Sequence, residues 1–396
     1  MTEPRRAAVI GTGLIGGSIG LALRARGWHV SGTDADPSHA ERALSLGAID
    51  AIGEDPEAEV TFVATPVSAV VPAALKALAA SEIAEAAENA QVADLAGRGA
   101  PGVAELAGRE EAGAAGAAGA RPRRVVTDVT GVKGPVTAAI THPRFVGGHP
   151  MAGSEQEGVD GADPDLFAGA TWVLTPTSTT SPEAFAQLRT IVSSLGADVI
   201  ALAPDNHDVL VALVSHVPHL TAATLMGLAA NGAAEQGALL RLAAGGFRDM
   251  TRVAAGHPGI WPDICAENRD AIVATLDELV ASLSEVREMV ASGNQAELLA
   301  RLSRARLARR ELPSPVSGTE ELVEVRVPVA DRPGALAEVT TLAGGLGVNI
   351  DDLVLTHSSE GDRGVLILVI DAHSVDRVRQ GLLDAGLHPS SVRRLD

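Results

Sequence analysis

The chain has 396 residues, of which 46% are hydrophobic, so it is too long for one core and predicts two or three globular domains. A formal net charge of -19 and 2% aromatic residues exclude a nucleic-acid partner, because an acidic surface repels phosphates and few rings can stack on bases. The single cysteine, Cys265, excludes an internal disulfide framework and a thiolate metal cluster, and it fits a cytoplasmic protein.

The N-terminal stretch predicts a dinucleotide-binding unit. Residues 6–10 form an apolar run typical of a buried strand, and GTGLIG at 11–16 stands between this strand and a predicted helix over 17–26. In this motif the first glycine allows a tight turn, the second admits a pyrophosphate, and the third lets the helix pack closely. We expect the following residues to contact the cofactor: Gly11, Gly13, Leu14, Ile15 and Gly16.

The next two predicted strands end in candidate cofactor ligands. Residues 29–33 lead into Asp34, whose carboxylate can accept from a ribose 2′-hydroxyl and would repel a 2′-phosphate, which favours NAD over NADP. Residues 60–64 lead into Thr65 and Pro66, at the sheet edge where open α/β sheets bind ligands.

The same glycines contain a competing pattern, GGSIG at 16–20, which fits the nucleophile elbow of hydrolases. An elbow serine lies at the turn between strand and helix, whereas Ser18 falls inside the predicted helix. A serine hydrolase is therefore not predicted.

Further elements complete a Rossmann-like, doubly wound domain over residues 1–203. Within it, residues 97–124 are rich in alanine and glycine and lack an apolar face, which predicts a flexible surface insertion. The remaining elements expected are strands at 124–128, 171–175 and 198–202, and helices at 68–80 and 182–195.

The stretch GGHPMAG at 147–153 places one imidazole among glycines. Pro150 disfavours the helical region for His149, so we expect the ring on a rigid loop where a ligand can approach. A neutral imidazole with a pKa near 6.5 is a general base for a hydroxyl group at neutral pH. The alternative is a turn in which His149 merely caps a strand.

Residues 204–312 show helical periods without a strand signal, which predicts an all-helical domain that buries its faces in a homodimer. The apolar stretch 210–230 is as long as a membrane span, but His216, Pro218 and His219 favour a core helix and no membrane partner. The two imidazoles could bind zinc, but no third ligand is apparent, so no metal is predicted.

Arg252 follows a glycine pair in GGFRDMTR at 245–252. Its guanidinium is suited to hold a carboxylate, and the alternative is a helix cap or a surface ion pair.

After a linker at 312–318, residues 320–396 predict a third unit in the order strand, helix, strand, strand, helix, strand. Its expected strands cover 322–329, 349–356, 364–371 and 391–395, and its helices begin near Gly334 and Ser374.

Together these motifs resemble the prephenate dehydrogenase family with a C-terminal ACT domain. The resemblance runs almost from end to end, and it rests on GTGLIGGS, GGHPMAGSE, VSHVPH, GGFRDMTR followed by Ile260-Trp261, and DRPGAL. It implies NAD-dependent oxidative decarboxylation of prephenate to 4-hydroxyphenylpyruvate, on the route to tyrosine.

The resemblance implies roles for individual residues. His149 matches the histidine that accepts a hydrogen bond from the ring hydroxyl, and Arg252 matches the arginine that holds a substrate carboxylate. The family's usual serine between histidine and nicotinamide falls on Gly131, which leaves Thr130 as the candidate hydroxyl. Further residues match the substrate pocket: Ser215, His219, Asp249, Trp261 and Glu155.

Two alternatives remain at this point. An arogenate dehydrogenase would place a carboxylate, from Glu155 or Asp249, near the substrate amine. A non-catalytic sensor of NAD and an amino acid would have no use for His149 with Arg252. The ACT resemblance implies tyrosine feedback near Gly334 and Asn349 at a subunit interface, against an unliganded dimerisation module.

Overall fold

The structure is a computed structural model, and the chain divides into two compact units, Met1–Glu311 and Leu312–Asp396. Glu155, residues 98–123 of the predicted insertion and the predicted linker at 312–318 lie outside the described residues. The structure describes residues 4–97, 124–154, 156, 158–235, 239–310, 322–330, 332, 334–350, 352–357, 363–389 and 391–394.

The first unit is built on an eight-stranded sheet in the order β3-β2-β1-β4-β5-β6-β7-β8. Neighbouring strands pair in parallel, except that β6 and β7 are antiparallel. The strands are β1 (Arg6–Ile10), β2 (His29–Thr33), β3 (Ala51–Ile52), β4 (Val60–Val63), β5 (Val125–Asp128), β6 (Phe145–Pro150), β7 (Thr171–Thr175) and β8 (Asp198–Ala201).

Helices cover both faces of this sheet. Adjacent residues of one strand point to opposite faces, and Val125 and Val126 of β5 accordingly belong to two separate apolar cores. The first core contains α1 (Leu14–Arg24) and α6 (Pro182–Ser194), and the second contains α3 (Val67–Gly97) and α5 (Gly134–Ala139). This arrangement confirms the predicted Rossmann-like class. The helix α2 (Pro37–Ser45), the strand β3 and the helix α5 were not predicted.

Helix α3 is much longer than the predicted helix over 68–80. Its second half is rich in alanine and glutamate, which favour helix even where the apolar periodicity fades. Buried Arg124 also fastens this part, because its Nη1 donates to the carbonyl of Ser81 at 3.0 Å and its guanidinium pairs with Glu88.

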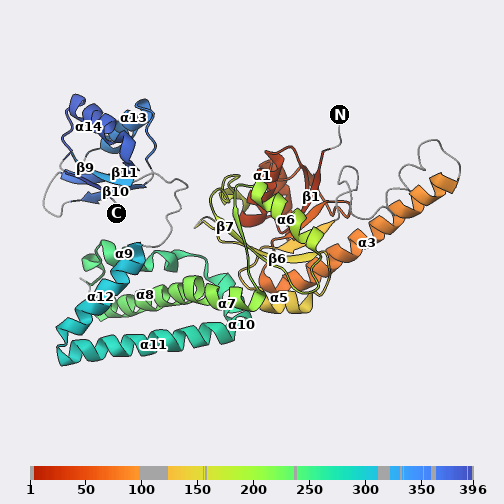
Figure 1. Cartoon of the computed structure of the whole chain (residues 1–396), viewed down its shortest axis with the longest axis horizontal. Helices are drawn as coiled ribbons and strands as arrows, with labels where there is room; N and C mark the ends of the chain where they lie inside the picture. Colours follow the sequence, from red (N-terminus) through yellow and green to blue (C-terminus); the bar gives the residue numbers. More distant parts are fainter. Residues whose placement is uncertain are drawn as a thin grey trace. The chain divides into compact units, whose positions relative to one another are not determined.

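The rest of the first unit is helical, as predicted, and η2 and α8 pack against α11 (Figure 1). Its only extended core among the described residues is a small cluster around Ala212, Val217 and Ile272, while large apolar side chains such as Leu228 and Val280 are more than half exposed. The elements are α7 (Pro204–Val211), the π-helix η2 (Ala212–His216), α8 (Val217–Glu235), α9 (Gly245–Thr251), α10 (Trp261–Glu267), α11 (Arg269–Ser292), α12 (Gln295–Arg310), and 3-10 turns η3 (Leu239–Leu242), η4 (Arg252–Ala255) and η5 (Pro258–Ile260).

Two stretches, Val67–Gln91 and Pro204–Gly232, are long and apolar enough to cross a membrane by length and composition alone. This is weak support for a span, because core helices of soluble proteins pass the same test. In the second stretch the buried side chains of His207, Asp208 and His216 are all hydrogen-bonded to other protein groups, which favours a helix packed within the protein.

The second unit has the predicted order of elements. Its four-stranded antiparallel sheet runs β10-β11-β9-β12, and two helices pack on it around a core that includes Val325, Leu368 and Val378. The elements are β9 (Leu322–Ala330), α13 (Ala335–Gly345), β10 (Asp352–His357), β11 (Arg363–Asp371), the 3-10 turn η6 (Ala372–Ser374), α14 (Val375–Asp384) and β12 (Ser391–Arg394).

Candidate active site

The glycine turn after β1 leaves open space where a phosphate would lie. Gly11 has φ +93°, and a Cβ there would lie 2.3 Å from the carbonyl oxygen of Ala64. A Cβ on Gly16 would lie 1.9 Å from the carbonyl oxygen of Gly11, so both glycines are required by close backbone packing. A Cβ on Gly13 would meet nothing within 4 Å, and no side chain caps the start of α1. Free amides and open space at a helix N-terminus fit an anion.

Two polar side chains beside this turn could bind the parts of a dinucleotide outside its phosphates. Oδ2 of Asp34 accepts from the Thr12 amide at 2.7 Å, and Oδ1 accepts from the Asp36 amide at 3.0 Å, which holds the carboxylate against the glycine turn. The hydroxyl of Thr65 is buried and has no hydrogen-bond partner within the described structure, as expected of a group that a ligand would satisfy. Exposed Pro66 follows it.

Ser18 of the hydrolase-like pattern is structural. It is buried within α1, where its hydroxyl donates to the Leu14 carbonyl at 2.8 Å and accepts from the Asp163 amide at 3.0 Å. It is therefore not a nucleophile at a strand-to-helix turn.

His149 lies in strand β6, so the prediction of a loop was wrong. The glycines before it serve the fit of β6 between its neighbours: a Cβ on Gly148 would lie 2.7 Å from the carbonyl oxygen of Asp128, and one on Gly147 would lie 2.4 Å from Oγ1 of Thr175. In the sequence such glycines are indistinguishable from turn residues. The ring of His149 is partly exposed near the end of the strand.

A chain of hydrogen bonds leads from His149 to the start of helix α5. Nδ1 of His149 lies 2.9 Å from Nε2 of His207, and Nδ1 of His207 lies 2.7 Å from Oδ1 of Asp208. The Asp208 carboxylate also accepts from the backbone amides of Lys133 and Gly134, each at 2.7 Å. His207 is fully buried and Asp208 nearly so. None of these partners was singled out in the sequence.

A buried ion pair supports the strand that carries His149. Nζ of fully buried Lys133 pairs with Asp128 and donates to the carbonyl of Gly148 at 2.8 Å. The hydroxyl of Thr130 donates to the same Asp128 carboxylate and lies 3.2 Å from the Lys133 ammonium. Its proton is thus directed at this cluster, and the role expected for Thr130 in place of the hydroxyl missing at Gly131 stays a prediction.

Gly131 lies next to the rings of two histidines. A Cβ on Gly131 would lie 3.7 Å from Nε2 of His149 and 3.9 Å from Nε2 of His216. His216 ends the π-helix η2, a kind of distortion that is frequent at functional sites. On its other side, Nδ1 of His216 lies 3.2 Å from Nδ2 of Asn268.

Trp261 extends the site away from the sheet. Its ring lies edge-on to His216 at 6.1 Å and stacks on His219 at 3.7 Å. A Cβ on Gly256, which directly follows η4, would lie 3.9 Å from the His219 ring. The structure therefore brings together four of the histidine and tryptophan side chains discussed above: His149, His216, His219 and Trp261.

The other predicted substrate residues that the structure describes differ in their exposure. Arg252 begins η4 and is exposed, Asp249 is exposed on α9, and Ser215 is half-buried next to His216. Within the described ranges no three His, Cys, Asp or Glu side chains are grouped as metal ligands.

The site keeps its histidines neutral. Burial lowers the pKa of His149 well below its ordinary value, and the neighbouring His207, Lys133 and His216 act in the same direction. Burial likewise lowers the pKa of His216 to about 4, against the opposing effect of Asp208. Both rings are therefore uncharged at neutral pH, as a base or a neutral donor requires.

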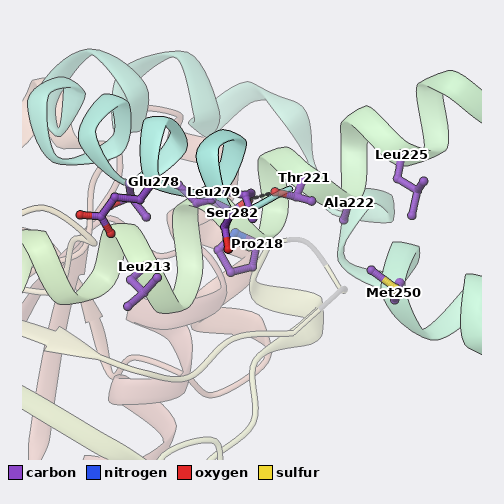
Figure 2. A pocket seen from close by; sticks show the side chains of 11 residues that line it. Leu213, Pro218, Thr221, Ala222, Leu225, Met250, Glu278, Leu279 and Ser282 are labelled. Atoms are coloured by element: carbon purple, nitrogen blue, oxygen red, sulfur yellow. Dashed lines mark hydrogen bonds between the residues drawn. The ribbon is translucent and has the colours of Figure 1, made fainter. Parts of the chain in front are cut away.

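A separate apolar pocket of about 530 Å³ lies in the helical part. Figure 2 shows side chains of η2, α8 and α11 around it, with Met250 of α9 at one end. Its lining includes Leu213 and Leu279 but none of the four residues grouped around Gly131, so it is distinct from the histidine site.

Comparison with known proteins identifies the family. Residues 203–304 match the family model described as prephenate dehydrogenase, dimerization domain, and residues 19–97 and 114–201 match prephenate dehydrogenase, nucleotide-binding domain. The chain is also 30% identical to the prephenate dehydrogenase of Bacillus subtilis (strain 168) over 369 residues, which is 90% of this chain and 89% of the relative. The chain belongs to the prephenate dehydrogenase family.

Solved structures of the family agree with the fold. The prephenate dehydrogenase of A. aeolicus, in complex with hydroxyphenyl propionate and NAD+, is 25% identical with a TM-score of 0.64, covering 79% of this chain and 99% of that one. The Synechocystis arogenate dehydrogenase is 28% identical with a TM-score of 0.58, covering 78% and 100%. Membership confirms the predicted family of oxidoreductases and its arrangement of a nucleotide-binding domain followed by a helical dimerisation domain.

Proposed function

We propose that this chain oxidises and decarboxylates prephenate to 4-hydroxyphenylpyruvate with NAD, with His149 as the base. The observation that carries the proposal is the imidazole of His149, whose Nδ1 lies 2.9 Å from Nε2 of His207 while its Nε2 lies on the side of the ring next to Gly131. Family membership and the family structure that contains NAD+ support the same reaction and cofactor.

The glycine turn and its neighbours would hold the cofactor. The α1 amides near Gly13 suit the pyrophosphate, Asp34 suits a ribose hydroxyl, and the unpartnered Thr65 hydroxyl suits a polar group of the ligand. When bound, NAD accepts a hydride from the ring carbon that bears the substrate hydroxyl.

His149 performs the proton transfer that this oxidation needs. Its Nε2 takes the proton of the ring hydroxyl, and the oxygen keeps the electron pair that becomes the carbonyl bond. Loss of carbon dioxide from the opposite ring carbon leaves its bonding electrons in the ring, which becomes aromatic. Since aromatisation supplies the driving force, the protein needs to supply positioning and a base.

The predicted substrate-binding residues would hold the substrate in position next to His149. Arg252 is suited to bind a carboxylate in a two-pronged contact, and His219 stacked on Trp261 forms one flat wall near η4. Ser215, Asp249 and Glu155 complete the proposed set.

Purified protein with NAD should form NADH when prephenate is added. Arogenate, assayed side by side, tests the second candidate, which the similarity to the Synechocystis arogenate dehydrogenase favours. No NADH from either substrate, together with binding of NAD and an amino acid, would support the sensor instead.

We propose that the helical domain forms a homodimer of a cytoplasmic enzyme. The exposed apolar side chains of α8 and α11, the apolar pocket lined by Leu213, and the match to a dimerization domain support this proposal. Leu213→Glu should shift the protein toward monomer in sedimentation velocity, and an unchanged mass would oppose this face as the interface.

We further propose that the second unit is an ACT domain that binds tyrosine at a subunit interface. Its strand and helix order supports this proposal. Gly334, at φ +91°, caps the start of α13, and exposed Asn349 follows the end of that helix. Calorimetry with tyrosine tests the proposal, and absence of heat would leave only a structural role for the unit.

A further inference from the structure

Asp208 holds groups on both sides of the histidine site. Its Oδ1 accepts from Nδ1 of His207 and from the Lys133 amide, and its Oδ2 accepts from the Gly134 amide, each at 2.7 Å. Its backbone carbonyl accepts from Nδ2 of Asn268 at 2.9 Å. Both its side chain and its main chain are therefore fixed, and each leads to a different histidine.

The side chain of Asp208 determines which nitrogen of His149 carries a proton. An ionised carboxylate only accepts hydrogen bonds, so Nδ1 of His207 must carry a proton. An imidazole with its single proton on Nδ1 has Nε2 as an acceptor. Nδ1 of His149, 2.9 Å away, must then donate. The lone pair of His149 is left on Nε2, the atom that faces the space beside Gly131.

The backbone of Asp208 determines the tautomer of His216. Because a carbonyl oxygen accepts, the amide nitrogen of Asn268 and not its oxygen must face Asp208. That nitrogen is also 3.2 Å from Nδ1 of His216, which therefore accepts. The low pKa of about 4 keeps His216 neutral, so its single ring proton lies on Nε2, again toward Gly131.

We propose that Asp208 is a positioning residue that fixes complementary tautomers of His149 and His216, so that the space beside Gly131 presents one proton acceptor and one proton donor. A hydroxyl group matches this pair, because it can donate to His149 and accept from His216. After the proton has moved to His149, the oxygen continues to accept from His216. This inference rests on the proposed function and names the residue that orients its base.

Nitrogen-15 NMR of the full chain with labelled histidine tests the proposal without any substrate. Protonated and unprotonated ring nitrogens have well-separated shifts, and the His149→Asn and His216→Asn variants assign the signals. We expect the proton on Nδ1 for His149 and on Nε2 for His216. The opposite tautomer at either ring in the unaltered protein would overturn the proposal, whether or not prephenate proves to be the substrate.

Variants then distinguish a positioning role of Asp208 from a purely structural role. Asp208→Asn can donate as well as accept, so we expect the tautomer of His149 to become mixed and kcat to fall by about 10- to 1,000-fold. Asp205→Asn is the matched control. It also removes one carboxylate charge from helix α7, but at a residue in the first turn of that helix, and it should leave the tautomers and kcat unchanged. Asn268→Leu should alter the tautomer of His216 alone. Unchanged tautomers in Asp208→Asn, or equal losses in Asp208→Asn and Asp205→Asn, would count against the proposal.

Discussion

Nδ1 of His149 lies 2.9 Å from Nε2 of His207, and this contact joins strand β6 of the nucleotide-binding part to helix α7 of the helical part. The two parts belong to one compact unit. The orientation of the proposed base therefore depends on residues from both sides of the boundary predicted near residue 203.

Replacement of His149 tests its role as the base. His149→Asn keeps a polar side chain but cannot take a proton, so kcat should fall by about 10²–10⁴-fold while the Kd of NAD stays unchanged. Steady-state kinetics and NAD titration measure the two effects. His142→Asn, at a partly exposed histidine paired with Glu82, is the control and should keep full activity. Equal turnover in His149→Asn and the unaltered chain would refute the assignment.

The pH profile should reflect the depressed pKa of His149. A base works only when unprotonated, so kcat/KM should stay high as the pH falls through 6.5 and should drop only at the lower pKa of this half-buried ring. Burial is the main cause of that lower pKa, and the neighbouring His207, Lys133 and His216 lower it further. An acid limb above pH 6.5 in the profile would contradict a base whose pKa is lowered by its surroundings.

Replacement of Arg252 tests whether its guanidinium binds the substrate carboxylate. Arg252→Ala should raise the KM for prephenate by about 10- to 100-fold with a smaller change in kcat, because it removes a charge-assisted contact made to ground and transition states alike. Arg248→Ala, at an exposed arginine one helical turn earlier on α9, should leave KM unchanged. A KM that is the same in both variants would remove Arg252 from the pocket.

Replacement of Lys133 tests how much its buried ion pair with Asp128 contributes to the stability of the fold. Lys133→Met leaves the Asp128 carboxylate buried without its partner, so the free energy of unfolding should fall by about 3–5 kcal/mol. Lys76→Met breaks the exposed pair with Glu54 and should cost about 0–1 kcal/mol. Urea denaturation compares the two, and similar midpoints would mean that the ion pair contributes little.

Two glycines separate folding from cofactor binding. Gly11→Ala forces a side chain into positive φ and against Ala64, so it should destabilise the fold by at least about 1–2 kcal/mol. Gly13→Ala meets no atom of the protein, so stability should be retained while the Kd of NAD rises by about tenfold or more. If Gly13→Ala binds NAD as tightly as the unaltered chain, the phosphate does not lie at this turn.

Much of the fold could be predicted from local patterns. The runs at 6–10 and 29–33 are short and are followed directly by Gly11 and Asp34, so their strands match the predicted limits. Helix α3 could not be delimited in this way, because its second half is held by Arg124, a residue that joins it from beyond a long insertion. Strand β6 was missed because Gly147 and Gly148 meet a packing need that only the neighbouring strands reveal.

The site was predicted only where a motif carries its own chemistry. His149 and the glycine turn fall into this class. His207, Asp208 and Asn268 do not, because each acts through a partner from a different helix or strand, and no spacing in the chain connects them. Thr130 shows the limit of adjacency: it stands next to Gly131 in the chain, but its hydroxyl is hydrogen-bonded to Asp128.

The thin core of the helical part has a consequence for handling the protein. Helix α12 buries no residue within its own chain and α11 buries only Ile272. If a second copy of the chain buries these helix faces, thermal stability depends on the dimer and rises with protein concentration. Melting curves recorded on dilute and concentrated samples would then not superimpose, and assays at nanomolar enzyme would lose activity during incubation for reasons unrelated to the chemistry.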